Sequence, residues 1–185
     1  VEVVTADGTL VRADAATHPE LYWAMRGAGA KFGVAVSFEF EAARVGQVAF
    51  AQLTFDASDV ADFVQRWGDA AQSAHRSVTG QVILGGRRPG APMLAQAMIL
   101  VNSDDPDTII ERLQPFAQVA PITEQSIALA SYDEVMGAFV DEHTPQRGQG
   151  EPHSHSALAQ QVTPQIAASI AEMVDSGASY FLQLR

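Results

Sequence analysis

Apolar and polar positions along the chain alternate with period two in some stretches and recur every three or four residues in others, which predicts strands and helices respectively. Asp7-Gly8 between two β-prone runs predicts a hairpin over residues 1–14. The other predicted strands span residues 34–41, 47–55, 78–84, 94–101, 122–128 and 179–185. The predicted helices span residues 17–26, 56–74, 105 to about 116, 131–138 and 163–177.

Capping signals mark where several of these helices begin. Ser/Thr followed three residues later by Glu predicts a capping box, and Asp-Pro or Thr-Pro predicts a cap followed by proline in the first turn. The predicted caps are Thr17 with Glu20, Asp105 before Pro106, Ser131 with Glu134, and Thr163 before Pro164. The polar stretch 141–155 is predicted to be a loop. From residue 45 onward the order of elements predicts an α+β fold, with a mostly antiparallel sheet and helices on one face.

The strands of this sheet carry an unusual set of residues on the face that the helices leave open. If the apolar alternate positions face the helices, four strands each place a glutamine on the opposite side. These glutamines are Gln52, Gln81, Gln96 and Gln183, and Phe50, Met98 and Phe181 lie around them. A surface of amides and aromatic rings suits a flat polar ligand or another domain. The alternative is a solvated face whose strands happen to use glutamine.

Composition and charge limit the classes of binding partner and of chemistry that this chain can have. The chain has 185 residues, of which 47% are apolar and 18% charged, and its net charge is −11. Such an acidic surface repels nucleic-acid backbones and anionic membranes. There is no cysteine, which excludes disulfides, thiolate zinc sites and a thiol nucleophile within these residues. No apolar run reaches the ~20 residues that span a bilayer, and no signal-peptide pattern is present, so a cytoplasmic protein is expected.

Motifs for dinucleotide binding, metal binding and hydrolysis are not supported by the predicted elements around them. The glycine-rich stretch of residues 27–33 follows a helix and opens a strand, whereas a dinucleotide fingerprint follows a strand and opens a helix. His153 and His155 with Glu151 have a spacing that can bind a metal, but a polar loop is the favoured interpretation and no metal site is predicted. No Gly-x-Ser-x-Gly elbow occurs, and paired carboxylates fit helix caps. No catalytic residue is assigned.

The first 42 residues resemble a segment of FAD-linked oxidases of the vanillyl-alcohol-oxidase superfamily, and most closely the berberine-bridge-enzyme-like group. The resemblance rests on an Asp-Gly hairpin, then the helix Glu20-Leu21-Tyr22-Trp23-Ala24-Met25-Arg26-Gly27, a glycine-rich turn, and Phe32-Gly33-Val34 opening a strand. It implies that residues 1–44 are the end of a PCMH-type FAD-binding domain. Residues 45–185 then look like the family's substrate-binding domain, whose open sheet face covers the flavin.

The resemblance also implies site residues and an activity. Gly29, Gly33 and the backbone of Val34 would lie near the adenine and pyrophosphate end of FAD. Gln81, Gln96, Met98 and Gln183 are the candidate substrate contacts. The expected reaction is hydride transfer from a small organic substrate to flavin, with O₂ as acceptor. Val1 lies inside a predicted strand, so a fragment that is inactive and does not retain FAD alone is expected. The alternative is a stand-alone binding module that forms a homodimer through the open face.

Overall fold

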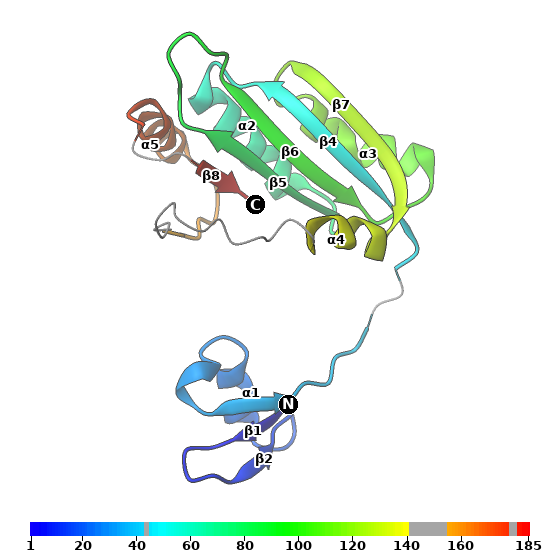
Figure 1. Cartoon of the computed structure of the whole chain (residues 1–185), viewed down its shortest axis with the longest axis vertical. Helices are drawn as coiled ribbons and strands as arrows, with labels where there is room; N and C mark the ends of the chain where they lie inside the picture. Colours follow the sequence, from blue (N-terminus) through cyan, green and yellow to red (C-terminus); the bar gives the residue numbers. More distant parts are fainter. Residues whose placement is uncertain (43–44, 141–154, 178–180) are drawn as a thin grey trace. The chain divides into compact units, whose positions relative to one another are not determined.

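The computed structural model describes residues 1–42, 45–140, 155–177 and 181–185, and the chain divides into two compact units, Val1–Arg44 and Val45–Arg185. The predicted loop 141–155 therefore lies almost wholly outside the described residues. Each unit has its own sheet, and we describe each by itself (Figure 1).

The first unit is a three-stranded antiparallel sheet with one short helix. Its elements are β1 (Glu2–Val4), β2 (Leu10–Arg12), α1 (Pro19–Met25), the 3₁₀ turn η1 (Gly29–Lys31) and β3 (Val34–Ser37). The strand order is β2-β1-β3, and Val3 of the central strand is opposite both Val11 and Ala35. The predicted hairpin is confirmed, since Gly8 takes a left-handed conformation with φ 81°.

Two local predictions for this unit are wrong. Thr17 does not cap α1: its backbone N–H donates to Asp14 Oδ1 at 2.7 Å, which holds it in a turn, and His18 occupies the cap position without a side-chain hydrogen bond. The strand predicted over residues 34–41 ends at Ser37. Ser37 is opposite Glu2, the first residue of β1, so the following residues have no strand beside them on that side.

The second unit is built on a five-stranded antiparallel sheet with the order β7-β4-β6-β5-β8. The strands are β4 (Gln47–Asp56), β5 (Val78–Gly85), β6 (Leu94–Val101), β7 (Ile122–Ser131) and β8 (Phe181–Leu184). The helices are α2 (Val60–Ser73), α3 (Pro106–Ala117), α4 (Tyr132–Val140) and α5 (Pro164–Asp175). The α+β fold with a mostly antiparallel sheet is thus as predicted.

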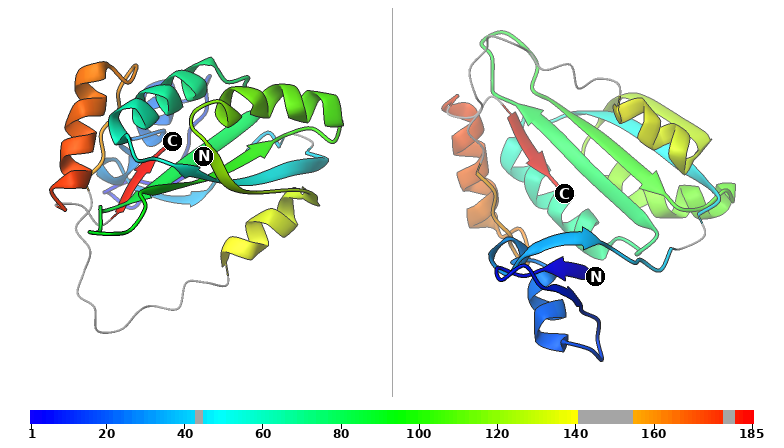
Figure 2. Two further views of the ribbon diagram at one scale, coloured as in Figure 1. Left: turned by 90° about the horizontal axis from the view of Figure 1, so that it is seen from above. Right: turned by 60° about the horizontal axis from the view of Figure 1, so that its bottom comes forward.

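The helices are not all on one face, which corrects the expected layering. α2 and α3 cover one face and α5 packs beside α2, whereas α4 lies on the opposite face (Figure 2). α4 contacts β4 and β7, the strands at that end of the sheet. Val48 of β4 is fully buried although its parity places it on the face away from α2. α4 contacts β4 on that face, which explains the burial of Val48. The chain runs directly from β7 into α4, and a helix in this position can fold back onto either face of the sheet.

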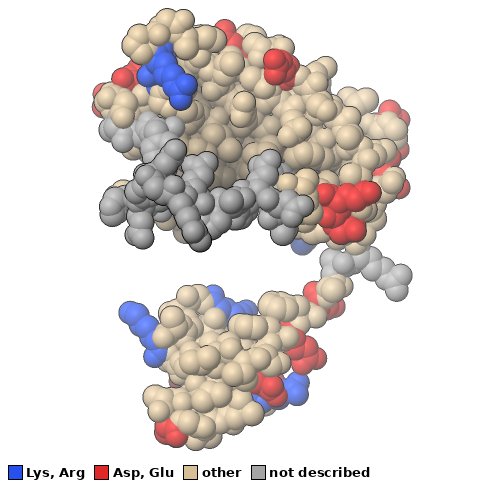
Figure 3. Space-filling model, viewed as in Figure 1, with Lys and Arg blue, Asp and Glu red and all other residues tan. Residues whose placement is uncertain are grey.

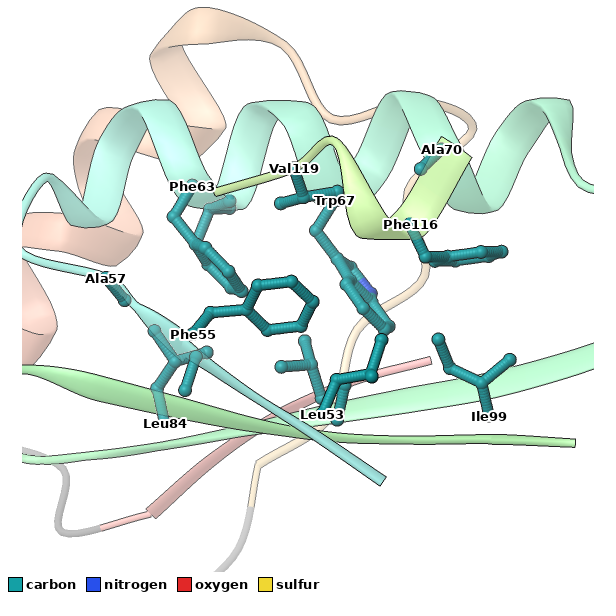
Figure 4. Close-up of a cluster of buried hydrophobic side chains, with 14 of the residues drawn as sticks. Leu53, Phe55, Ala57, Phe63, Trp67, Ala70, Leu84, Ile99, Phe116 and Val119 are labelled. Atoms are coloured by element: carbon teal, nitrogen blue, oxygen red, sulfur yellow. The ribbon is translucent and has the colours of Figure 1, made fainter. Parts of the chain in front are cut away.

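Aromatic rings fill the core between the sheet and α2 and α3 (Figure 4). The rings of Phe55 and Phe63 lie 5.6 Å apart and those of Trp67 and Phe116 lie 5.2 Å apart, centroid to centroid. Both spacings are typical of favourable tilted pairs. Trp67 is 1% exposed and lies at the centre of this cluster.

Most predicted helix caps are present. Ser131 and Glu134 form a reciprocal capping box, and Thr163 Oγ1 accepts the N–H of Ile166 at 3.3 Å. The start predicted for α2 is wrong: β4 continues to Asp56, which is opposite Leu94 in the sheet, and Asp59 caps the helix instead. None of the described helices is long and apolar enough to cross a membrane.

Asp105 caps α3, and we expect this cap to make a contribution to the stability of the second unit that is lost in acid. The hydroxyl and the backbone N–H of Thr108 donate to its carboxylate and hold the pKa of Asp105 below its usual 3.8. The stabilisation is therefore present above pH 3.8 and is lost as the pH falls through the lowered pKa. We expect the thermal midpoint of the wild type to fall more steeply as the pH drops below 3.8 than that of Asp105→Asn, which caps without titrating. Equal slopes in thermal melts followed by circular dichroism would contradict this.

Candidate functional site

Strand parity places the candidate residues on one surface of the second unit. Ala51, Leu53 and Phe55 of β4 are buried toward the helices, so the residues between them point to the other side. The same alternation holds in β5 and β6. We call this side the open face. It is formed by Phe50, Gln52, Thr54, Asp56, Thr79, Gln81, Ile83, Leu94, Gln96, Met98, Leu100, Glu124, Ser126, Ala128, Phe181, Gln183 and Arg185.

The register brings the predicted substrate contacts into two adjacent rows across the strands. Met98 is the cross-strand neighbour of both Gln52 and Gln81. In the next row, Gln96 is opposite Ile83, which is in turn opposite Gln183. Directly opposite side chains in such pairs start about 4.5–5.5 Å apart, so each row is a continuous surface. The structure therefore brings together Gln81, Gln96, Met98 and Gln183.

Two of the glutamines are fixed by a hydrogen-bonded chain. Gln183 Nε2 donates to Gln81 Oε1, and Gln81 Nε2 makes a weak contact to Met98 Sδ at 3.9 Å. Arg185 donates to Gln183 Oε1 at 3.5 Å. Within the described residues, the side chains of Gln52 and Gln96 make no hydrogen bond and are exposed. The open face therefore has an ordered part at β5 and β8 and two unpartnered amides on β4 and β6.

The open face carries almost no charge although the chain is strongly acidic. Its described residues on β5 and β6 are uncharged, and the ionisable side chains of its described part lie at its margins: Asp56 at the end of β4, Glu124 on the edge strand β7, and Arg185 directly after β8. Figure 3, which looks onto this face, shows mainly uncharged surface over the middle of the sheet. Such a face can offer hydrogen bonds and apolar contact, but it offers no titratable group for acid or base catalysis at its centre.

In the first unit the structure gives packing reasons for the predicted cofactor residues. A Cβ on Gly33 would lie 2.5 Å from the backbone oxygen of Val4, and one on Gly29 would lie 3.0 Å from Met25 Cε. Val34 is 69% exposed as the first residue of β3. Gly33 is thus required by the unit's own packing, whereas a Cβ on Gly29 would meet only the end of the flexible Met25 side chain. Their contact with FAD stays a prediction.

A cavity of about 460 Å³ lies directly before this turn, lined by Trp23, Ala24, Arg26, Gly27 and Ala28. The Arg26 guanidinium lies over the Tyr22 ring, 4.6 Å from its centroid. Trp23 and Arg26 belong to the helix on which the family resemblance rests, but sequence reasoning did not select them as site residues. Sequence reasoning could have selected Trp23 and Arg26 because both are large side chains with a polar tip in one short predicted helix.

A second cavity, of about 420 Å³, lies on the helix side of the second unit and is separate from the open face. It is lined by Asp56, Asp59 and Asp62 among others, and Asp62 pairs with Arg66 at 2.8 Å. In the part of the chain that the structure describes, no group of three or more metal-binding side chains comes together. His155 is exposed, whereas Glu151 and His153 lie outside the described residues.

The donor set of the open face fits a flavin ring and a substrate beside it. A flat ring with polar edges needs apolar contact on its face and neutral donors and acceptors at its rim, and the open face offers Met98, Ile83 and the amides for these roles. The donor set of the open face therefore fits the ring of FAD, and binding of FAD by this chain stays a prediction.

Comparisons with known proteins point the same way. No family model matches the chain. The chain is 37% identical over 68 residues to xylooligosaccharide oxidase of Thermothelomyces thermophilus, covering 36% of this chain and 14% of that protein. It is 30% identical over 149 residues to (R)-6-hydroxynicotine oxidase of Paenarthrobacter nicotinovorans, and the match covers 75% of this chain and 32% of that protein. It is 25% identical over 185 residues to the FAD-linked oxidoreductase tazG of Aspergillus terreus, and the match covers 95% of this chain and 37% of that protein.

A solved structure shares the fold. The xylooligosaccharide oxidase from Myceliophthora thermophila C1, in complex with xylobiose, superposes with a TM-score of 0.60 at 23% identity. The match covers 77% of this chain and 30% of that one. The chain thus spans roughly a third or less of the relatives it matches, 14% to 37% of the three curated proteins above. Within that span, it is a homologue of the FAD-linked oxidoreductases of the berberine-bridge-enzyme-like group in the vanillyl-alcohol-oxidase superfamily.

Proposed function

We propose that this chain forms part of an FAD-dependent oxidoreductase that oxidises a small organic substrate by hydride transfer, with O₂ as the electron acceptor. Residues 1–44 would supply the end of a PCMH-type FAD-binding domain, and residues 45–185 would supply substrate-binding structure. The observation that carries the proposal is the open face, whose centre is uncharged and bears amides, in a chain homologous to FAD-linked oxidoreductases. Homology supports FAD as the cofactor, and the open face supports a role for this chain in binding the substrate beside it.

The chemistry that bound FAD supplies is acceptance of a hydride at N5 and transfer of the two electrons to O₂, which takes two protons and leaves as hydrogen peroxide. The described residues bind and orient. Gln81, Gln96 and Gln183 would hold the polar groups of the substrate, and Met98 would contact its apolar surface. Backbone groups of Gly29, Gly33 and Val34 would contact the adenine and pyrophosphate end of FAD. None of these residues removes a proton.

The full gene product, isolated with its flavin, tests the activity. Candidate substrates are added without oxygen and the absorbance of oxidised flavin is followed, and air is then admitted and hydrogen peroxide is measured. Bleaching of the flavin, followed by its recovery with stoichiometric peroxide, supports the proposal. A gene product that carries no flavin when isolated and binds none when FAD is added would contradict it.

Replacing Gln96 by alanine tests the role of the open face. Gln96 is exposed and makes no hydrogen bond within the described residues, so its loss should leave the fold intact. We expect KM for an oxidised substrate to rise about tenfold, the value of one good hydrogen bond, with kcat less affected. The matched control is Gln114→Ala on the exposed side of α3, which should leave both constants unchanged. Equal effects of the two variants would remove the open face from substrate binding.

A second function of another class is a dimerisation module. The unpartnered amides of Gln52 and Gln96 could pair with those of a second copy across the open face. Light scattering of the purified chain separates the two functions. A stable dimer that Gln52→Arg disrupts would favour the module, because the new charges would face one another in the interface.

A further inference from the structure

The edge strand β7 leaves one side of the second unit's sheet without a neighbouring strand (Figure 1). It stands at one end of the strand order and has ten residues, whereas β8 at the other end has four. Within the described residues, β7 pairs with β4 alone. Every second N–H and C=O along its free side therefore points away from the sheet, where it can bond to another strand.

β7 lacks most of the features that normally protect such an edge from pairing. Proteins protect an edge with lysine or proline, with a very short strand, or with a bulge that turns the strand away. β7 contains no lysine or proline, and Glu124 is its one charged residue. Its register with β4 shifts once, past Thr123, so the ladder is regular over residues 124–131. This regular part can accept a partner strand.

Exposed apolar side chains accompany the free edge. Ile127 and Leu129 of β7 are 51% and 48% exposed, although the β4 residues opposite them are fully buried. Tyr132 and Met136 belong to α4, the helix that follows β7 directly, and are exposed to a similar degree. Segment 127–136 thus presents four large apolar side chains beside unpaired backbone groups. Contiguous exposed apolar surface of this kind is typical of a protein–protein interface.

A second copy of β7 complements this edge. Two copies of one strand that are related by a two-fold axis pair antiparallel, so the numbers of opposite residues have a constant sum. With Ala128 on the axis, Ile127 of each copy lies opposite Leu129 of the other. This apolar pair then occurs twice on the helix side, where cross-strand contacts stabilise a sheet. The paired segment is 125–131, which lies within the regular part of the strand.

The charge on β7 favours the same register. With Ala128 on the axis, Glu124 lies opposite Tyr132 of the second copy. The two Glu124 carboxylates are then roughly 26 Å apart along the edge, the length of eight strand residues. This separation is well beyond the Debye length of about 8 Å, so the two charges are screened from each other. A register centred on Glu124 would instead place like charges directly opposite, which is destabilising.

The other edge strand of a second copy, β8, is a poorer partner. It has four residues, so a contact between β7 and β8 would form fewer backbone hydrogen bonds than one between two β7 strands. Such a head-to-tail contact also leaves a free edge on each copy and continues into a filament, whereas pairing of β7 with β7 closes after two copies.

We propose that β7 is a dimerisation edge, at which two copies of this chain pair antiparallel about a two-fold axis at Ala128 and form one continuous ten-stranded sheet. The proposal goes beyond the proposed function and concerns the edge of the sheet, not its open face. Backbone hydrogen bonds over residues 125–131 and apolar contacts of Ile127 and Leu129 hold the two copies together. An interface made by one strand from each copy is small, under about 1,200 Å². We therefore expect a reversible dimer with a micromolar dissociation constant.

Sedimentation velocity of the full chain over a series of concentrations tests the association. We expect a reversible equilibrium between monomer and dimer. Ile127→Glu should raise the dissociation constant at least about tenfold, because it removes the apolar contact and brings like charges together near the axis. The matched control is Met173→Glu on α5, a helix that packs against α2. Met173 is exposed to a similar degree, and its replacement should leave the equilibrium unchanged.

Disulfide crosslinking tests the register, since the chain has no cysteine of its own. Opposite residues of an antiparallel pair have Cα atoms about 4.5–5.5 Å apart, which a disulfide can bridge. With oxidised glutathione as the oxidant, Ala128→Cys should form a covalent dimer at least about tenfold faster than Ser126→Cys. The two copies of position 126 would be roughly 13 Å apart along the edge, the length of four strand residues. Gln96→Cys, in the middle of the open face, should crosslink as slowly as Ser126→Cys.

Each of four results would overturn the proposal. The first is a chain that stays monomeric at every concentration, and the second is a dimer that Ile127→Glu weakens no more than Met173→Glu does. The third is faster crosslinking through Gln96→Cys than through Ala128→Cys, which would place the dimer contact on the open face. The fourth is growth into larger polymers, which would show that the contact does not close. The flavin-bleaching experiment is independent of these results, because the proposed activity assigns no role to β7.

Discussion

Replacing Trp67 by alanine is expected to lower the free energy of unfolding of the second unit by about 3–5 kcal/mol, the range for truncating a large buried aromatic side chain. Trp67 is 1% exposed and its ring packs against Phe63 and Phe116. Alanine would leave a cavity between the sheet and two helices, which the close-packed neighbours can only partly fill. Chemical denaturation followed by circular dichroism measures the change.

Two companion variants make this result specific. Ile110→Ala removes a side chain that is 68% exposed on α3 and should change stability by less than about 0.5 kcal/mol. Trp67→Phe should cost clearly less than Trp67→Ala, because it keeps a ring in place and removes an indole N–H that has no hydrogen-bond partner in the described part of the chain. A Trp67→Ala protein as stable as Ile110→Ala would mean that the aromatic cluster is not the centre of the core.

Gly33→Ala is expected to destabilise the first unit by about 1–3 kcal/mol, the usual cost of forcing extra volume into a packed site. The added Cβ would lie 2.5 Å from the oxygen of Val4 and 2.6 Å from Val3 Cγ1. Because Val4 contributes backbone atoms of the central strand, the clash cannot be relieved by a side-chain rotation. Hydrogen exchange at the amides of β1 and β3 measures the loss, with faster exchange than in the wild type.

Gly27→Ala is the matched control, since a Cβ at this position meets nothing within 4 Å. Its exchange rates in β1 and β3 should equal those of the wild type. The pair also separates two roles of the glycine-rich turn. If both variants exchange normally but Gly33→Ala alone loses flavin in the full gene product, Gly33 serves the cofactor and not the packing.

Local chemistry made most of the fold predictable. The capping box of Ser131 and Glu134 and the cap at Asp105 were readable because each needs only residues three apart. The same local pattern failed at Thr17, where Asp14 takes the N–H of Thr17 and moves the start of α1 to the next residue. The sequence pattern could not choose between a capping box and this turn, since the N–H of Thr17 has an acceptor in both: Glu20 in the capping box and Asp14 in the turn.

The candidate site was predictable in part. Alternation alone put the glutamines on one side of their strands, because side chains in a strand point alternately to the two faces. It could not show that Gln81 and Gln183, 102 positions apart, share a hydrogen bond while Gln52 and Gln96 have no partner among the described residues. That difference depends on strand order and register.

The sequence by itself determined the element types, the α+β class, the parity of the open face and the resemblance to FAD-linked oxidases, because each depends on residues close together in the chain. Only the tertiary structure decided that β8 lies beside β5, that α4 covers the end of the face opposite α2, and which glutamine amides pair with one another within the described residues. These are outcomes of packing between distant segments, where side-chain volume and burial select one arrangement among several that the local pattern allows.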